Sequence, residues 1–195
     1  DLLKIIKTKK SDVVFLENVK NLENHDKGKT LEIIINKLKE IGYHVKYKVL
    51  NTMEYGNVPQ NRERIYIVGF LDEQSYSKFE FPKKQKLNKK IKDIINFSEK
   101  KEEAFYYKKY KIYNEIKDKI TRQDTLYQWR RKYVRENKSN VCPALTANMG
   151  TGGHNVPLVL DNYDIRKLTP EECLAFQGFP ADFKFPKTVS RAESY

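Results

Sequence analysis

The stretch "VVFLENVKNL", residues 13–22, passes from four apolar residues directly to an acid and an amide, Glu17 and Asn18. A short, continuous apolar run predicts a strand that is buried on both faces of a parallel sheet. Functional sites are built at strand ends in α/β sheets, and an unpaired carboxylate there costs desolvation free energy. Glu17 is therefore either a solvated turn residue or a functional acid, and this stretch alone does not decide between them.

The α/β pattern continues to about residue 75. Apolar residues at helical spacing predict a helix that ends before Gly42, and they are Leu31, Ile34, Ile35, Leu38 and Ile41. Alternation over residues 43–50 predicts a half-buried strand, and "RIYIVGF", residues 64–70, predicts another. We therefore expect residues 1–75 to form a partial parallel α/β sheet.

Charge favours a polyanionic partner. The 195 residues hold 38 Lys plus Arg against 26 Asp plus Glu, a net charge of +12, and phosphates with condensed counterions reward such a surplus. The sequence shows no apolar run of membrane-spanning length and no signal-peptide pattern. Its two cysteines cannot form a disulfide scaffold or a zinc cluster, which predicts a reducing compartment such as the bacterial cytoplasm.

Lys-rich and aromatic-rich segments with few turn signals occupy residues 76–140. The block "WRRKYVRENK", residues 129–138, places Arg130, Arg131 and Arg135 among aromatic residues. Such interleaving suits phosphate contact together with base stacking or base-edge readout. The alternative is the solvated charged face of a helix, and the sequence leaves both open.

Two further segments complete the chain. "CPALTANMGTGGHNVPLVL", residues 142–160, has glycines that allow a close backbone approach, and its lone His154 lacks the neighbours of a metal site. "RKLTPEECLAFQGFP", residues 166–180, predicts a short helix. Thr169 caps this helix, Glu172 completes a capping box, and Gly178 closes it.

Three segments of the chain, at residues 17–19, 60–64 and 166–180, resemble in that order motifs of the DNA (cytosine-5) methyltransferases. "ENV" resembles the sixth of that family's ten motifs, "QNRER" the eighth, and "RKLTPEECLAFQGFP" the ninth. Within the family, "VRENKSNVCPALTANMGTGGHNVPLV" is most similar to bacterial enzymes that modify GGCC. The resemblance implies a partial S-adenosylmethionine-dependent methyltransferase sheet, Rossmann-like, with a smaller irregular lobe that recognises the target.

The family's reaction gives Glu17 a task. A cysteine thiolate adds to C6 of a cytosine flipped out of duplex DNA, and C5 then takes a methyl group from S-adenosylmethionine. The resemblance assigns Glu17 to N3 of the ring and Arg64 to O2. By the same mapping Asn18 braces the nucleophile loop, and Arg62 steadies phosphate or neighbouring loops.

The resemblance also implies a set of DNA-binding residues and a set of structural residues, and it implies no metal site. The expected DNA-binding residues are Arg130, Arg131, Arg135, Leu145, Thr146, Asn148, Gly152, Gly153 and His154. The expected structural residues of the motifs are Gln60, Arg166, Leu168, Thr169, Glu172 and Gly178.

The family's nucleophile lies in a Pro-Cys dipeptide beside a glycine-rich donor loop, and neither occurs here. Cys142 precedes its proline, and Cys173 sits inside the capped helix, so neither is the nucleophile. We therefore expect a fragment that is inactive alone, with most of the donor pocket, the first four motifs and the tenth on a second segment or chain.

The expected organisation has three parts. Residues 1–75 are the C-terminal part of the catalytic domain, residues 76–165 the target-recognition region, and residues 166–195 the ninth-motif helix with the approach to the tenth motif. Three alternatives are a DNA-binding remnant without activity, one half of a split enzyme, and a relative that acts on transfer RNA. The basic insert favours DNA.

Overall fold

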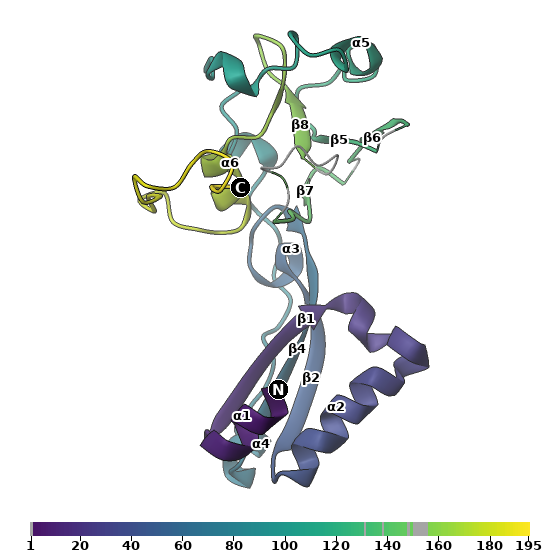
Figure 1. The fold of residues 1–195 in the computed structure, drawn as a ribbon, viewed down its shortest axis with the longest axis vertical. Coiled ribbons are helices and arrows are strands. Elements are labelled where there is room, and N and C mark those ends of the chain that lie inside the picture. Colours follow the sequence, from purple (N-terminus) through teal and green to yellow (C-terminus); the bar gives the residue numbers. More distant parts are fainter. Residues whose placement is uncertain (1, 131, 138, 148, 150–155) are drawn as a thin grey trace. The chain divides into compact units, whose positions relative to one another are not determined.

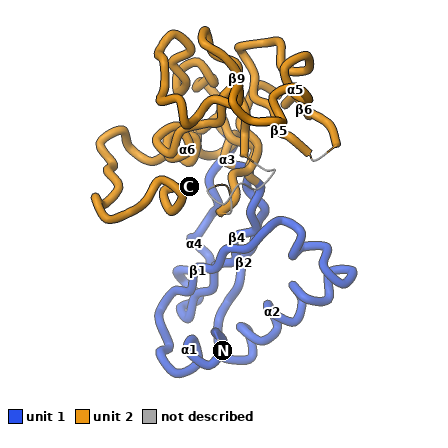
Figure 2. Tube along the Cα trace, turned by 45° about the horizontal axis from the view of Figure 1, so that its top comes forward, with its two compact units in different colours: residues 1–51, 63–84 blue, residues 52–62, 85–195 orange. Residues whose placement is uncertain are grey.

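The structure, a computed structural model, describes residues 2–130, 132–137, 139–147, 149 and 156–195. It divides into two compact units, drawn in different colours in Figure 2. Unit 1 holds residues 1–51 and 63–84, and unit 2 holds residues 52–62 and 85–195. None of the helices in the described ranges has the length and apolar character needed to span a membrane.

Unit 1 is a three-stranded sheet with helices (Figure 1). Its elements are α1 (Leu2–Lys9), β1 (Val13–Val19), η1 (Lys20–Glu23), η2 (His25–Gly28), α2 (Lys29–Glu40), β2 (His44–Asn51), β4 (Glu63–Phe70) and α4 (Glu73–Lys78). The predicted helix and all three predicted strands are confirmed, whereas the sequence analysis did not anticipate α1.

The strand directions correct the prediction of a parallel sheet. The order is β1-β4-β2, and β4 pairs antiparallel with both neighbours. The strands β1 and β2 therefore run in the same direction, but β4 lies between them in the opposite one. Apolar patterning predicts that a strand exists, but its direction depends on where the connecting loop returns the chain.

One face of this sheet forms the core of unit 1. Val14, Ile65 and Ile67 from the strands pack with Ile6 of α1 and with Leu38 of α2. At Gly69 of β4 a Cβ atom would lie 2.8 Å from Cγ2 of Val14, so only glycine allows β1 and β4 to approach this closely.

The other face is only partly covered. Phe79, after α4, packs on Phe70 with ring centroids 5.2 Å apart, but on β1 the side chain of Val13 is 47% exposed and that of Phe15 is 64% exposed. The prediction that β1 is buried on both faces is therefore wrong for the residues that the structure describes. Residues of β1 on this face, Glu17 among them, are open to partners.

Unit 2 is built around a four-stranded antiparallel sheet of order β6-β5-β8-β9, which the sequence did not reveal. Its elements are α3 (Thr52–Tyr55), β3 (Gln60–Asn61), η3 (Ile91–Asp93), η4 (Glu103–Phe105), α5 (Tyr113–Ile116), β5 (Tyr127–Trp129), β6 (Val134–Glu136), β7 (Cys142–Pro143), β8 (Pro157–Leu160), β9 (Ile165–Lys167) and α6 (Pro170–Phe176). The second sheet is a parallel pair of β3 with β7.

The helix α6 begins as predicted. The Oγ1 atom of Thr169 accepts from the backbone N–H of Glu172, and the Glu172 carboxylate accepts from the backbone N–H of Thr169. Gly178 follows with φ +83°, the left-handed conformation that ends helices. The capping box and the glycine stop are therefore confirmed.

A buried ion network ties α6 to the sheet. Arg166 of β9 has no exposed surface. Its Nε atom donates to Oδ2 of Asp161 over 2.6 Å, and its Nη1 and Nη2 atoms donate to the two carboxylate oxygens of Glu172 over 2.8 Å each. Tyr106 donates its hydroxyl hydrogen to the same Asp161 oxygen over 3.0 Å.

Replacing Arg166 should destabilise unit 2 severely. The change Arg166→Met leaves two buried carboxylates without their cation, which typically costs about 3–5 kcal/mol. Trp129, the single Trp of the chain, lies on β5, so urea unfolding followed by its fluorescence reports this unit.

The matched control is Arg122→Met. Arg122 also binds two carboxylates, those of Asp124 and Glu136, but it is solvent-exposed, and exposed ion pairs contribute little. We expect a stability close to that of the wild type for this variant. An Arg166→Met protein whose stability equals that of the control would contradict the structural role of the network.

Candidate functional site

Glu17 and Arg64 meet on the partly open face of the unit 1 sheet. Arg64 lies opposite Val19 across the β1–β4 pair, and Glu17 lies opposite Tyr66, so the two residues are diagonal neighbours on one face. Nε of Arg64 lies 2.7 Å from Oε1 of Glu17, with side chains that are 17% and 43% exposed. The fold therefore brings together the two residues that the sequence analysis assigned to one pyrimidine ring.

Asn18 points to the opposite face of β1 from Glu17, because side chains alternate along a strand. Its Oδ1 atom accepts from the backbone N–H of Val19 over 2.8 Å, which fixes the chain where β1 ends and η1 begins. Asn18 therefore helps to hold the strand end, while Glu17 faces outward from it.

The first three residues of "QNRER", which are Gln60, Asn61 and Arg62, belong to unit 2. Nη1 of Arg62 donates to the backbone carbonyl of Leu145 over 3.3 Å, which ties the β3 segment to the chain after β7. This contact supports the expectation that Arg62 steadies a neighbouring loop. Gln60 has no exposed surface, and neither of its side-chain polar atoms has a hydrogen-bond partner among the described residues.

The basic block forms a strand pair. Strands β5 and β6 pair antiparallel, with Gln128 opposite Arg135, so the alternative of a charged helix face is wrong for the described part of the block. Arg135 is exposed, and its Nη2 atom donates to Oε1 of Gln128 over 2.9 Å. Arg130, at the end of β5, donates its backbone N–H to the carbonyl of Tyr133.

Other predicted DNA-binding residues differ in their placement. Leu145 is buried in the core, so its side chain is not presented to a partner, whereas Thr146 is exposed. Five of the predicted residues lie outside the described residues, and they are Arg131, Asn148, Gly152, Gly153 and His154. Within the described ranges, no His, Cys, Asp and Glu side chains cluster as metal ligands.

Sequence reasoning missed two polar residues of unit 2, Gln128 and Asp161. It also missed the ion pair between Lys20 and Glu63 in unit 1, in which Nζ of Lys20 lies 2.7 Å from Oε1 of Glu63. The strand β5 has three residues, too few to reveal an alternating pattern. The pairing of Asp161 with Arg166 could have been predicted from the sequence. A short polar turn between two strands brings the residues on either side of it together, and Asp161 and Arg166 lie on either side of such a turn.

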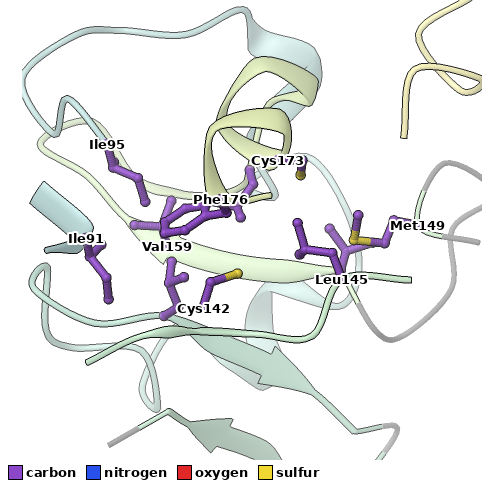
Figure 3. Packing of buried hydrophobic residues seen from close by; sticks show 11 residues of the cluster. Ile91, Ile95, Cys142, Leu145, Met149, Val159, Cys173 and Phe176 are labelled. Atoms are coloured by element: carbon purple, nitrogen blue, oxygen red, sulfur yellow. The ribbon is translucent and has the colours of Figure 1, made fainter. Parts of the chain in front are cut away.

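Both cysteines lie in the core of unit 2, with Cys142 on β7 and Cys173 on α6 (Figure 3). The core contains Leu126, Leu145, Met149, Val159, Leu168 and Phe176 as well. Burial raises the pKa of the Cys142 thiol and of the Cys173 thiol. Both groups are therefore protonated at neutral pH, and neither has the character of a nucleophile.

Comparison with known proteins places these residues in a family. A family model described as "C-5 cytosine-specific DNA methylase" matches residues 1–195. The Type II methyltransferase M.Bsp6I of Bacillus sp. (strain RFL6) is 57% identical over 96% of this chain and 60% of its own length. The Type II methyltransferase M.HhaI of Haemophilus parahaemolyticus is 34% identical over 98% of this chain and 60% of its own.

Solved structures show the same fold. The Dnmt2 methyltransferase of S. pombe aligns with a TM-score of 0.62 at 16% identity, covering 94% of this chain and 58% of the other. A putative DNA modification methyltransferase encoded within an E. coli prophage also aligns with a TM-score of 0.62 at 16% identity, covering 98% and 65%. The chain thus spans about three fifths of these relatives. Their names state no target sequence, so similarity to GGCC-modifying enzymes stays a prediction.

The burial of both thiols should make them unreactive in the native protein. In the native protein at neutral pH, we expect neither Cys142 nor Cys173 to react with a thiol-specific disulfide reagent within minutes, because both thiols are buried and protonated. Absorbance of the released chromophore gives the number of reacting thiols. The same protein in denaturant is the control and should react fully. Rapid native reaction of either thiol would contradict its placement in the core.

Proposed function

The chain belongs to the C-5 cytosine-specific DNA methylases. We propose that it supplies the part of a bacterial DNA (cytosine-5) methyltransferase that binds the target cytosine and the DNA duplex. The target base would be flipped out of duplex DNA and methylated at C5. Unit 1 carries the residues for the base, and unit 2 carries those for the duplex.

The observation that carries the proposal is the Glu17–Arg64 pair. In cytosine, N3 and O2 are adjacent acceptor atoms on one edge of the ring. A protonated Glu17 can donate to N3, and the Arg64 guanidinium can donate to O2, from side chains already in contact over 2.7 Å. Both contacts withdraw electrons from the ring, which makes C6 easier to attack.

This arrangement is effective because the fold holds Glu17 and Arg64 in position before the base binds. Arg64 is mostly buried, and its Nη1 atom also donates to the backbone carbonyl of Glu63 over 2.9 Å. A donor fixed before the substrate arrives costs no reorganisation when charge develops in the transition state. The sheet register thus supplies the orientation that this chemistry needs.

The methyl donor would be S-adenosylmethionine, which supplies an electrophilic methyl group when bound. Within the described residues, no glycine-rich turn follows a strand of the unit 1 sheet, so we assign none of them to the donor. We propose that the donor loop and the Pro-Cys nucleophile come from the part of the protein that corresponds to the remaining length of the relatives.

Duplex DNA is the proposed partner of unit 2. Its strand pair β5–β6 presents Arg130, Lys132 and Arg135, and the chain as a whole carries a net charge of +12. We propose residues 76–165 as the target-recognition region and residues 166–195 as its support. The Type II relatives suggest a role in a restriction-modification system in the bacterial cytoplasm.

A second candidate function is sequence recognition without catalysis, as a DNA-binding remnant or as one half of a split enzyme. The observation that favours it is the burial of both thiols, which leaves residues 1–195 without an accessible nucleophile. The two candidates differ in whether a segment with a Pro-Cys dipeptide completes the chain.

Residues 1–195 alone should transfer no methyl group to DNA. The C5 position becomes nucleophilic only after a thiolate adds to C6, and both thiols here are buried and protonated. Labelled methyl donor and a mixed-sequence duplex provide the assay. The positive control is a chimera in which residues 1–195 replace the matching part of the Bacillus relative. Transfer of the label to DNA by residues 1–195 alone would refute the proposal that the nucleophile and the donor loop lie outside these residues.

In the chimera, Glu17→Gln should slow methylation by roughly 10²- to 10⁴-fold, the usual contribution of a general acid. The amide cannot deliver a proton to N3, while DNA affinity should stay nearly unchanged because Glu17 contacts the base and not the phosphates. Single-turnover methylation and fluorescence anisotropy measure the two quantities.

The matched control for this variant is Glu63→Gln. Glu63 is a carboxylate of similar exposure on the same strand pair, 40% against 43%, and it is also held in a 2.7 Å ion pair. The Glu63→Gln chimera should lose little methylation activity. Equal rates for Glu17→Gln and Glu63→Gln would show that Glu17 is not the acid.

A further inference from the structure

Arg135 is held by a neutral partner. On the β5–β6 strand pair, Gln128 lies directly opposite Arg135, and its Oε1 atom accepts a 2.9 Å hydrogen bond from Nη2 of Arg135. Gln128 is 4% exposed, whereas Arg135 is exposed. A buried amide thus holds one side of a guanidinium that stands at the surface.

Arg122 near the same strand pair is held differently. Its guanidinium binds the carboxylates of Asp124 and Glu136 over 3.0 Å. Two carboxylates more than cancel the positive charge, so Arg122 attracts anions only weakly. The amide of Gln128 fixes geometry without cancelling charge, and Arg135 therefore keeps its full attraction for DNA.

Gln128 is itself fixed in place. It lies on the central strand β5, between β6 and β8, where it is opposite Arg135 on one side and Pro157 on the other. Its neighbour Tyr127 is buried, and the Tyr127 hydroxyl accepts from the backbone N–H of Arg122 over 3.0 Å. An acceptor on a buried central strand is a rigid support for a long side chain.

We propose that Gln128 is a positioning residue that orients Arg135 to read a base edge in the major groove, with guanine as the preferred base. The inference rests on the proposed DNA-binding function and adds which residue sets specificity. Arginine has several N–H donors, so one bond to Gln128 leaves a planar edge that matches guanine O6 and N7. A phosphate accepts a guanidinium from many directions, and a fixed orientation brings little benefit there.

The test uses residues 1–195 and a pool of duplexes with randomised sequence, which requires no knowledge of the target. Bound duplexes are sequenced to obtain the base preference at each position. The variants are Gln128→Met, Arg135→Met and the double variant, and the control is Gln123→Met, an exposed glutamine that bonds Asn162. Thermal unfolding of each variant accompanies the selection.

We expect Gln128→Met to lower the preference for guanine at one position by about tenfold, within the range of a lost bidentate contact. The same position should change in Arg135→Met, and the double variant should be no worse than Arg135→Met, because Gln128 acts through Arg135. A residue with only a structural role would lower the unfolding temperature and weaken all sequences alike.

A second measurement reports on positioning without DNA. The ¹⁵N relaxation of the Arg135 Nε–H group should show a rigid side chain in the wild type and a mobile one in Gln128→Met. In Gln128→Glu the bond persists but the added carboxylate cancels the charge, so Arg135 should stay rigid while the affinity for duplex DNA falls.

The outcomes distinguish the positioning role of Gln128 from the proposed DNA-binding function. Wild-type preference at every position in Gln128→Met, or an equally rigid Arg135 in that variant, would overturn the positioning role alone. A wild-type chain that binds no duplex from the pool would overturn the proposed DNA-binding function, and the positioning role with it.

Discussion

The buried guanidinium of Arg166 is the interaction on which the rest of unit 2 depends. Burial opposes its charge, but the carboxylates of Glu172 and Asp161 outweigh that effect, so the pKa of Arg166 stays raised. Glu172 serves the network and the cap of α6 at once, because its Oε2 atom accepts both from Nη1 of Arg166 and from the backbone N–H of Thr169. The start of α6 and the strand β9 are therefore fixed by one residue. Phe176 and Cys173, which α6 delivers to the core, are positioned by the same contact (Figure 3).

In unit 1 the corresponding constraint is strand direction. Because β4 runs antiparallel to β1, its N-terminal end lies beside the C-terminal end of β1, where the acid stands. A parallel strand in this position would have placed Arg64 at the far end of the sheet from Glu17. The diagonal register then sets both side chains on one face. The geometry that we assign to cytosine therefore follows from a feature of the sheet, the strand direction, that the sequence analysis predicted wrongly.

Local patterns predicted what depends on local physics. The helix α2, the strands β1, β2 and β4, and the capping box of α6 each follow from the spacing or identity of neighbouring residues. Strand direction, the exposure of Phe15 and the pairing of Gln128 with Arg135 depend on segments far apart in the chain or on strands of three residues, too short to show a period. The resemblance identified Glu17 and Arg64 as a pair, but it carried no information on how the fold brings them into contact.

The partners of each arginine indicate its role more clearly than the net charge does. Arg166 is enclosed by two carboxylates and has a structural role, and Arg122 is neutralised in the same way at the surface. Arg64 contacts the carboxylate of Glu17, and in the proposed function both groups bind the target base. Arg135 donates to the side-chain amide of Gln128, which orients the guanidinium and leaves its charge intact. Because phosphates and base edges attract only charge that is not already cancelled, the proposed electrostatic attraction for DNA depends on the acceptor that holds each cation.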